Sequence, residues 1–342
     1  MEIKDLAGLS EPLTRLIEVI SQGVGEVSRP YLVRKNADAK AYEIRAIAGA
    51  LKDVADRHQL PAVFKDGEIE MWQRTEDRTL SLEAPDYEIR STRRLGYQQR
   101  KRQDNVESIT AVAAAELSQQ TEVADERPDE DWINRFFRAA EDVSSEQMQE
   151  LWGRILSGEV IKPGSYSLKT LEFMRNITKS DADLIVEMAK LAVFYSGSAI
   201  LPTPAKEWLR TERNIYPGHH FAAGELGIMY PTDLSYRIFR ETDMTQEVFL
   251  SGGFVLIVDR GSVTSQIELP VWKFTGIGQE VLQLIPVDGD EPHLTQIGEF
   301  FAARNAPSKT AQVIERIPNG AVRFQNAKDI RLPVESAPDE NV

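Results

Sequence analysis

Apolar residues follow a helical period through the centre of the chain. Between Asp131 and Phe194 they recur at spacings of three and four residues, which places them on one face of successive helices. The pairs Ser144/Gln147 and Ser180/Asp183 match the capping-box pattern that begins a helix. Gly158 is expected to end one helix, and Pro163-Gly164 predicts a turn. Short helices with brief connections predict a compact helical bundle over residues 129–200.

The N-terminal region predicts a hairpin and a long helix. Ala62–Lys65 and Glu68–Trp72 flank Asp66-Gly67, a dipeptide that tolerates the positive φ angles of a tight hairpin turn. The sequence from Tyr87 to about Gln120 predicts one helix whose narrow apolar seam consists of Val106, Ile109, Ala113 and Leu117. Such a seam either packs within its own domain or supports self-association with a second copy. We therefore expect a helical region at 1–124 with a β-hairpin at 62–72.

The last third of the chain mixes helix and strand patterns. Phe254–Val258 predicts a buried strand, and Val263–Phe274 predicts one or two strands broken by Pro270. Tyr216–His220 is expected to form a loop. The strands and the helix after Thr275 resemble the end of a winged-helix domain, with Ser235–Glu241 or the preceding helix as its recognition helix.

The predicted fold class is mainly α, with a helical bundle at its centre. A small β-hairpin precedes the bundle, and an α+β, winged-helix-like module follows it at 201–330. The Pro-rich and acidic tail, 331–342, is expected to be disordered.

Charge and composition restrict the function. The chain has a net charge of −14, which makes it a poor general binder of DNA or anionic membranes. It has no cysteine, so disulfides and thiolate metal sites are excluded. No catalytic or phosphate-loop motif is present, and we expect no cofactor and no metal. The adjacent His219 and His220 would be the first place to look if the protein were an enzyme.

A cluster of cations stands out against this acidic background. Six basic residues and no acidic residue lie between positions 90 and 102. The candidate binding residues are Arg90, Arg93, Arg94, Tyr97, Arg100, Lys101 and Arg102. Arginine can bind phosphate through two parallel hydrogen bonds, and tyrosine can stack on a base. Three interpretations stay open at this point: a solvated face that pairs with acidic segments, a nucleic-acid or nucleotide site, and a surface for an acidic protein.

Several motifs carry a resemblance to a known family. They are LW-x-RIL-x-GE at 151–159, PGS-x-SL-x-T-L at 163–171 and the S-x-x-D that follows. With the N-terminal segment LIEVISQGVGEVSRPYL and FTGIGQEVLQLI near the end, the chain resembles the bacterial domain-of-unknown-function family 2806. The resemblance implies no catalytic residue. Related helical proteins often lie near phage-defence genes, so it also implies a possible part in antiviral defence.

These observations lead to one expected function and two alternatives. We expect a non-enzymatic interaction or regulatory protein of the bacterial cytoplasm, with a protein partner or self-association and no membrane contact. The start of the chain, MEIKDLAGLS, has no basic segment before an apolar core, so no secretory signal is expected. The first alternative is a nucleic-acid-binding regulator, and the second is an enzyme of unrecognised class.

Overall fold

The computed structural model describes residues 10–24, 62–65, 68–71, 87–232, 235–240, 246–261, 265–317 and 322–332. The chain divides into two compact units, 1–171 and 172–342. Each unit is described by itself below. The predicted three-part division at 1–124, 129–200 and 201–330 stays a prediction, and the predicted disordered tail lies almost wholly outside the described residues.

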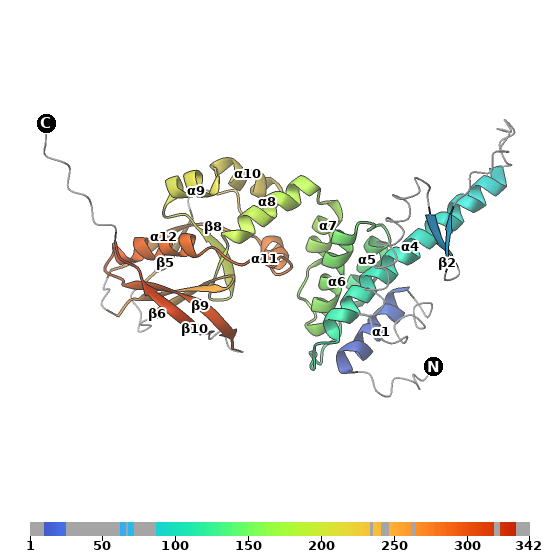
Figure 1. Cartoon of the computed structure of the whole chain (residues 1–342), viewed down its shortest axis with the longest axis horizontal. Helices are drawn as coiled ribbons and strands as arrows, with labels where there is room; N and C mark the ends of the chain where they lie inside the picture. Colours follow the sequence, from blue (N-terminus) through green and yellow to red (C-terminus); the bar gives the residue numbers. More distant parts are fainter. Residues whose placement is uncertain are drawn as a thin grey trace. The chain divides into compact units, whose positions relative to one another are not determined.

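Unit 1 is helical. Its elements are α1 (Glu11–Val24), β1 (Ala62–Lys65), β2 (Glu68–Met71), α4 (Tyr87–Leu117), α5 (Glu130–Ala140) and α6 (Glu146–Ile161), and α7 (Leu168–Asn176) crosses the unit boundary. The strands β1 and β2 pair antiparallel, with Lys65 opposite Glu68, at the positions of the predicted hairpin. Helix α4 packs against α6, α1 and α5 (Figure 1).

Aromatic rings fill the core of this bundle. Trp132 and Phe136 stack with ring centroids 5.1 Å apart, and Trp152 lies 5.3 Å from Phe136. The indole N–H of Trp132 donates to the carbonyl of Tyr166 at 2.6 Å, so its polar atom is satisfied inside the core. The seam of α4 is also buried here, with Ile109 and Leu117 fully covered. The described part of the seam therefore packs inside its own bundle.

Some predicted helix boundaries were wrong. Helix α6 is capped by Ser145, whose hydroxyl accepts from the backbone N–H of Met148, and not by Ser144. The helix continues through Gly158 to Ile161. Glycine at this position leaves space for Tyr166, because a Cβ there would lie 2.7 Å from the tyrosine ring. The next capping box is formed by Thr178 and Asp181.

Helices α4 and α6 approach each other closely at Gly153. A Cβ at this position would lie 2.5 Å from Cβ of Val112, and the facing segment of α4 cannot retreat without opening the core. We expect Gly153→Ala to lower the free energy of unfolding by about 1–3 kcal/mol, as overpacked cores do. Urea denaturation measures the change. Adding Val112→Gly removes both atoms of Val112 that the new Cβ would meet, so the double variant should be less destabilised than the sum of the two single variants. Strictly additive effects would contradict this packing.

Unit 2 is built on a sheet that the sequence did not predict. Eight strands form one antiparallel sheet in the order β10-β9-β7-β6-β3-β4-β8-β5. The strands are β3 (Val193–Tyr195), β4 (Ser198–Pro202), β5 (Tyr236–Phe239), β6 (Gln246–Ser251), β7 (Phe254–Asp259), β8 (Ile267–Lys273), β9 (Ser308–Arg316) and β10 (Val322–Asp329). The helices are α8 (Lys179–Lys190), α9 (Lys206–Arg213), α10 (Pro217–Glu225), α11 (Gly276–Leu282) and α12 (Glu291–Ala302).

This sheet corrects the predicted fold class. The chain is not mainly α. The winged-helix interpretation was also wrong, because its strands belong to the eight-stranded sheet and Ser235–Glu241, one of the two segments named as recognition helix, contains β5, which pairs with β8. Pro270 does not break β8: it lies beside the end of β4, where Pro202 is the last strand residue, and its carbonyl still accepts from the N–H of Thr203 at 2.8 Å.

One face of the sheet is covered by α12 (Figure 1). Leu294, Ile297 and Phe301 of this helix pack against inward-facing residues of the strands, among them Phe249 and Leu256. None of the helices in the described ranges is long and apolar enough to cross a lipid bilayer.

Candidate basic interface on α4

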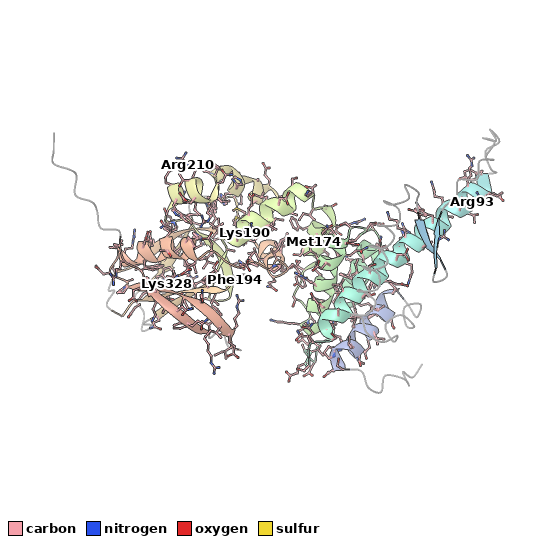
Figure 2. The ribbon with its side chains drawn as sticks, viewed as in Figure 1. Arg93, Met174, Lys190, Phe194, Arg210 and Lys328 are labelled. Carbon is pink, nitrogen blue, oxygen red and sulfur yellow. The ribbon has the colours of Figure 1, made fainter. Side chains whose placement is uncertain are left out.

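The N-terminal part of α4 is largely exposed. Buried side chains occur on this helix only from Asn105 onward. Before that point even apolar side chains face solvent, with Leu95 52% and Tyr97 63% exposed. We call residues Tyr87–Asp104 the arm. Figure 2 labels Arg93 on this arm, beyond the part of α4 that packs on α5 and α6.

The cations of the arm lie on one face. Successive residues of an α-helix are rotated by about 100°, so six of the candidate residues fall within an arc of about 120°. We call them the basic stripe: Arg90, Arg93, Arg94, Tyr97, Arg100 and Lys101. The centre of this arc lies opposite the buried seam. The stripe therefore faces away from the bundle.

Arg102 does not belong to the stripe. It follows the seam, four residues before Val106, and its guanidinium lies 3.7 Å from the carboxylate of Glu141 on the bundle. The sequence held the signal for this separation, because the phase of the seam already assigns Arg102 to the packed side. The seven candidate residues thus divide into six on the stripe and one that holds α4 to its neighbours.

The stripe cations have no acidic partners among the residues that the structure describes. Some other arginines of unit 1 do: Arg15 lies near Glu18, and Arg154 lies near Glu116 and Glu150. The exposed Arg135 and Arg138 of α5 resemble the stripe in having no ion pair within the described ranges. The described geometry therefore does not support the interpretation that this face pairs with acidic segments of the same chain.

The arm is electrostatically unfavourable as it stands. Arg90 has like-charged neighbours at Arg93 and Arg94, three and four residues away, and each such pair destabilises a helix by a few tenths of a kcal/mol. Arg90, which lies in the first turn, also opposes the helix dipole. An anion bound along the stripe would relieve both effects, so binding and helix formation should reinforce each other.

Gly96 weakens the arm further. Alanine is favoured over glycine in a helix interior by about 0.8–1 kcal/mol. A Cβ here would meet only the guanidinium of Arg100, at 3.5 Å. We expect Gly96→Ala to stabilise the arm locally by about 0.5–1 kcal/mol, measured as slower amide hydrogen exchange over residues 90–104. The effect on stability has the opposite sign from that of Gly153→Ala because the added methyl group meets open space on the arm. Faster hydrogen exchange in the variant would contradict this.

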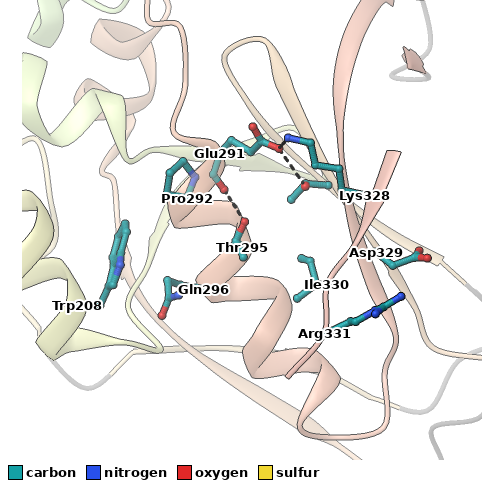
Figure 3. A pocket seen from close by; sticks show the side chains of 10 residues that line it. Trp208, Glu291, Pro292, Thr295, Gln296, Lys328, Asp329, Ile330 and Arg331 are labelled. Atoms are coloured by element: carbon teal, nitrogen blue, oxygen red, sulfur yellow. Dashed lines mark hydrogen bonds and ion pairs between the residues drawn. The ribbon is translucent and has the colours of Figure 1, made fainter. Parts of the chain in front are cut away.

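Unit 2 has a shallow cavity of about 450 Å³ between α12 and the last strands (Figure 3). Some of its polar groups are paired: the carboxylate of Glu291 lies 3.0 Å from the ammonium group of Lys328 and accepts from the hydroxyl of Thr310. Asp329 and Arg331 also line the cavity. The carboxylate of Glu291 is therefore held in an ion pair that is already formed.

The two adjacent histidines have structural roles. The segment predicted as a loop is the start of α10, because Pro217 sets a helical φ angle and Nδ1 of His219 accepts from the N–H of Tyr216 at 3.1 Å. His220 is buried and stacks on Trp272 at 4.5 Å, with Nε2 donating to the carbonyl of Tyr230. Within the ranges given above, no three histidine or carboxylate side chains gather as metal ligands do.

The comparisons with known proteins add a family. A model described as "protein of unknown function (DUF2806)" matches residues 89–297. The chain belongs to this family. The DUF2806 match begins within the arm, so it includes the whole basic stripe, and it ends in α12, before β9 and β10. No curated protein and no solved structure matches the chain significantly.

Proposed function

We propose that this chain is a non-enzymatic interaction protein that binds an acidic macromolecule through the basic stripe of α4. One observation carries the proposal: five exposed cations share one face of a helical arm and have no carboxylate partner among the described residues. A bound polyanion would remove the repulsion between them and offset the unfavourable dipole.

The non-enzymatic part of the proposal rests on the sequence, in which no recognised catalytic motif is present. In unit 2 the two adjacent histidines take part in capping and stacking. The regulatory role, the bacterial cytoplasm and the part in antiviral defence stay predictions.

Charge reversal on the stripe tests the proposal. We expect Arg93→Glu with Arg100→Glu to abolish retention of the full chain on immobilised heparin at about 0.15 M salt, because one edge of the stripe changes from attraction to repulsion. The matched control is Arg135→Glu with Arg138→Glu, which makes the same charge change at exposed positions of α5. Retention unchanged by the stripe variant, or abolished equally in the control, would contradict the proposal.

A further inference from the structure

We propose that the acidic partner is double-stranded DNA, with the arm of α4 seated in the major groove and the stripe cations on the phosphates of both strands. This inference rests on the proposed function and names the partner of the same stripe. It follows from the shape of the arm, the arrangement of its cations and the residues that the stripe lacks.

The arm has a convex shape. It is a single helix with no buried side chain over Tyr87–Asp104, so most of its surface, including the stripe, is accessible to a partner. A helix with its side chains is about 10–12 Å across, and the major groove of B-form DNA is about 12 Å wide. Proteins bind single strands in positively charged grooves that carry aromatic side chains for base stacking. A single convex helix provides no such groove. The shape therefore favours a duplex.

The stripe cations form two rows. Arg93 and Arg100 are one heptad apart and lie along one edge of the stripe. Arg94 and Lys101 repeat the same spacing along the other edge, about 100° away around the helix, and Tyr97 lies between the rows. A helix in the major groove has one phosphate backbone on each side. Two parallel rows of cations match two backbones, whereas a single acidic strand or helix would meet one row.

The chemistry of the stripe favours phosphate over an acidic protein. Four of its five cations are arginines, whose guanidinium groups bind phosphate oxygens in pairs. Protein interfaces gain most of their affinity from buried apolar and aromatic anchors. Exposed apolar side chains are few here: Tyr97 lies on the stripe, Tyr87 and Ile89 lie beside its two edges at the start of the arm, and Leu95 lies on the opposite side. Phosphate binding needs no such anchor and dominates affinity for DNA of any sequence.

The acidic character of the chain does not oppose this inference at short range. Charges separated by more than about 8 Å of water are largely screened at physiological salt. Within the arm only Glu88 and Asp104 are acidic, and these lie at its two ends. The stripe therefore presents a local positive field. The overall negative charge would instead limit contact elsewhere and confine DNA to the arm.

Binding of the full chain to labelled probes tests the inference. A DNA duplex of about 20 base pairs, roughly two helical turns, would be compared by fluorescence anisotropy with one of its single strands, an RNA duplex of the same sequence and polyglutamate. The variants remove one row each: Arg93→Gln with Arg100→Gln, and Arg94→Gln with Lys101→Gln. The control is Arg135→Gln with Arg138→Gln on α5. An unchanged unfolding temperature shows that each variant is folded.

The expected result has three parts. The DNA duplex binds tightest, and RNA binds more weakly because its major groove is deep and narrow. The affinity of each row variant falls about tenfold or more at about 0.15 M salt, and that of the control is unchanged. The slope of log affinity against log salt becomes shallower by about 1.8 in each row variant, because each neutralised phosphate contributes about 0.9 to this slope and two cations are removed.

Other results would overturn the inference. Stripe-dependent binding of polyglutamate without duplex binding would leave the proposed function standing and exclude DNA. Tighter binding of the single strand, abolished by Tyr97→Ala, would assign the stripe to unpaired bases. Dependence on one row only would exclude seating between two backbones. If no probe bound through the stripe, the inference and the proposed function would both fail.

Discussion

Replacing Glu247 with alanine should lower the free energy of unfolding of unit 2 by about 3–5 kcal/mol. The carboxylate of Glu247 lies 2.9 Å from the guanidinium of Arg260, and both side chains are less than 5% exposed. Tyr195 donates its hydroxyl to the same carboxylate, and Arg260 also donates to the carbonyl of Arg240. Without Glu247 the charge of Arg260 would stay buried with no counter-charge, which is the costly step.

A matched pair of variants separates the effect of the buried charge from the effect of a smaller side chain. Replacing both partners, with Glu247→Leu and Arg260→Met, should recover most of the stability, because no isolated charge then remains inside. The surface pair Arg323–Glu315 is the control, and Glu315→Ala should change stability by less than about 1 kcal/mol. Urea denaturation gives the values. An effect at Glu247 as small as that at Glu315 would show that the pair is solvated.

Acidification from pH 6.5 to 4 should destabilise unit 2 through His293. Burial lowers the pKa of this histidine to about 4, and its Nε2 donates to the carbonyl of Pro202 at 2.9 Å. Its ordinary pKa is 6.5, so above pH 6.5 the residue is neutral in both the folded and the unfolded chain. Below that pH His293 becomes protonated in the unfolded chain but stays neutral in the folded chain, so stability falls until the folded site also titrates near pH 4.

The magnitude follows from the size of the shift. At about 1.4 kcal/mol per pKa unit, the destabilisation approaches about 3 kcal/mol by about pH 4.

Asp290 affects stability at lower pH than His293 does. Burial raises the pKa of this carboxyl, but hydrogen bonds from Arg213 and from the backbone N–H of His293 outweigh burial and hold it below its usual value. The ionised Asp290 therefore stabilises the folded state above its unfolded pKa of 3.8, and this stabilisation is lost as the pH falls through the lower pKa of the folded state.

The variant His293→Gln isolates the histidine. Glutamine keeps a donor for Pro202 but does not titrate, so stability should change little between about pH 6.5 and pH 4. Chemical denaturation at several pH values measures both proteins. Parallel pH profiles for the two would assign the acid sensitivity to other groups.

The sequence was most informative about the candidate site and the helices of unit 1. The seven candidate residues lie within thirteen positions of the sequence, so they can be recognised before the fold is known, and the apolar seam of α4 indicates which way they face. The sequence could not show whether acidic segments of the same chain would pair with them, because such pairs join residues that are far apart in sequence. Arg102 illustrates this: its partner, Glu141, lies on another helix.

The eight-stranded sheet was missed for a physical reason. Strand β3 spans only Val193–Tyr195 and begins shortly after helix α8 in one continuous run of apolar residues. Strand β10 is almost wholly exposed and polar, so neither strand shows the alternation that marks a half-buried strand. Sheet formation depends on partners distant in the chain, such as β7 with β9, and local pattern does not encode that pairing. By itself the sequence determined the helical periodicity, the absence of thiol chemistry and the basic stripe of α4. Only the tertiary structure decided that the seam is buried, that the histidines are structural and that the stripe is exposed, because burial depends on which distant segments pack together.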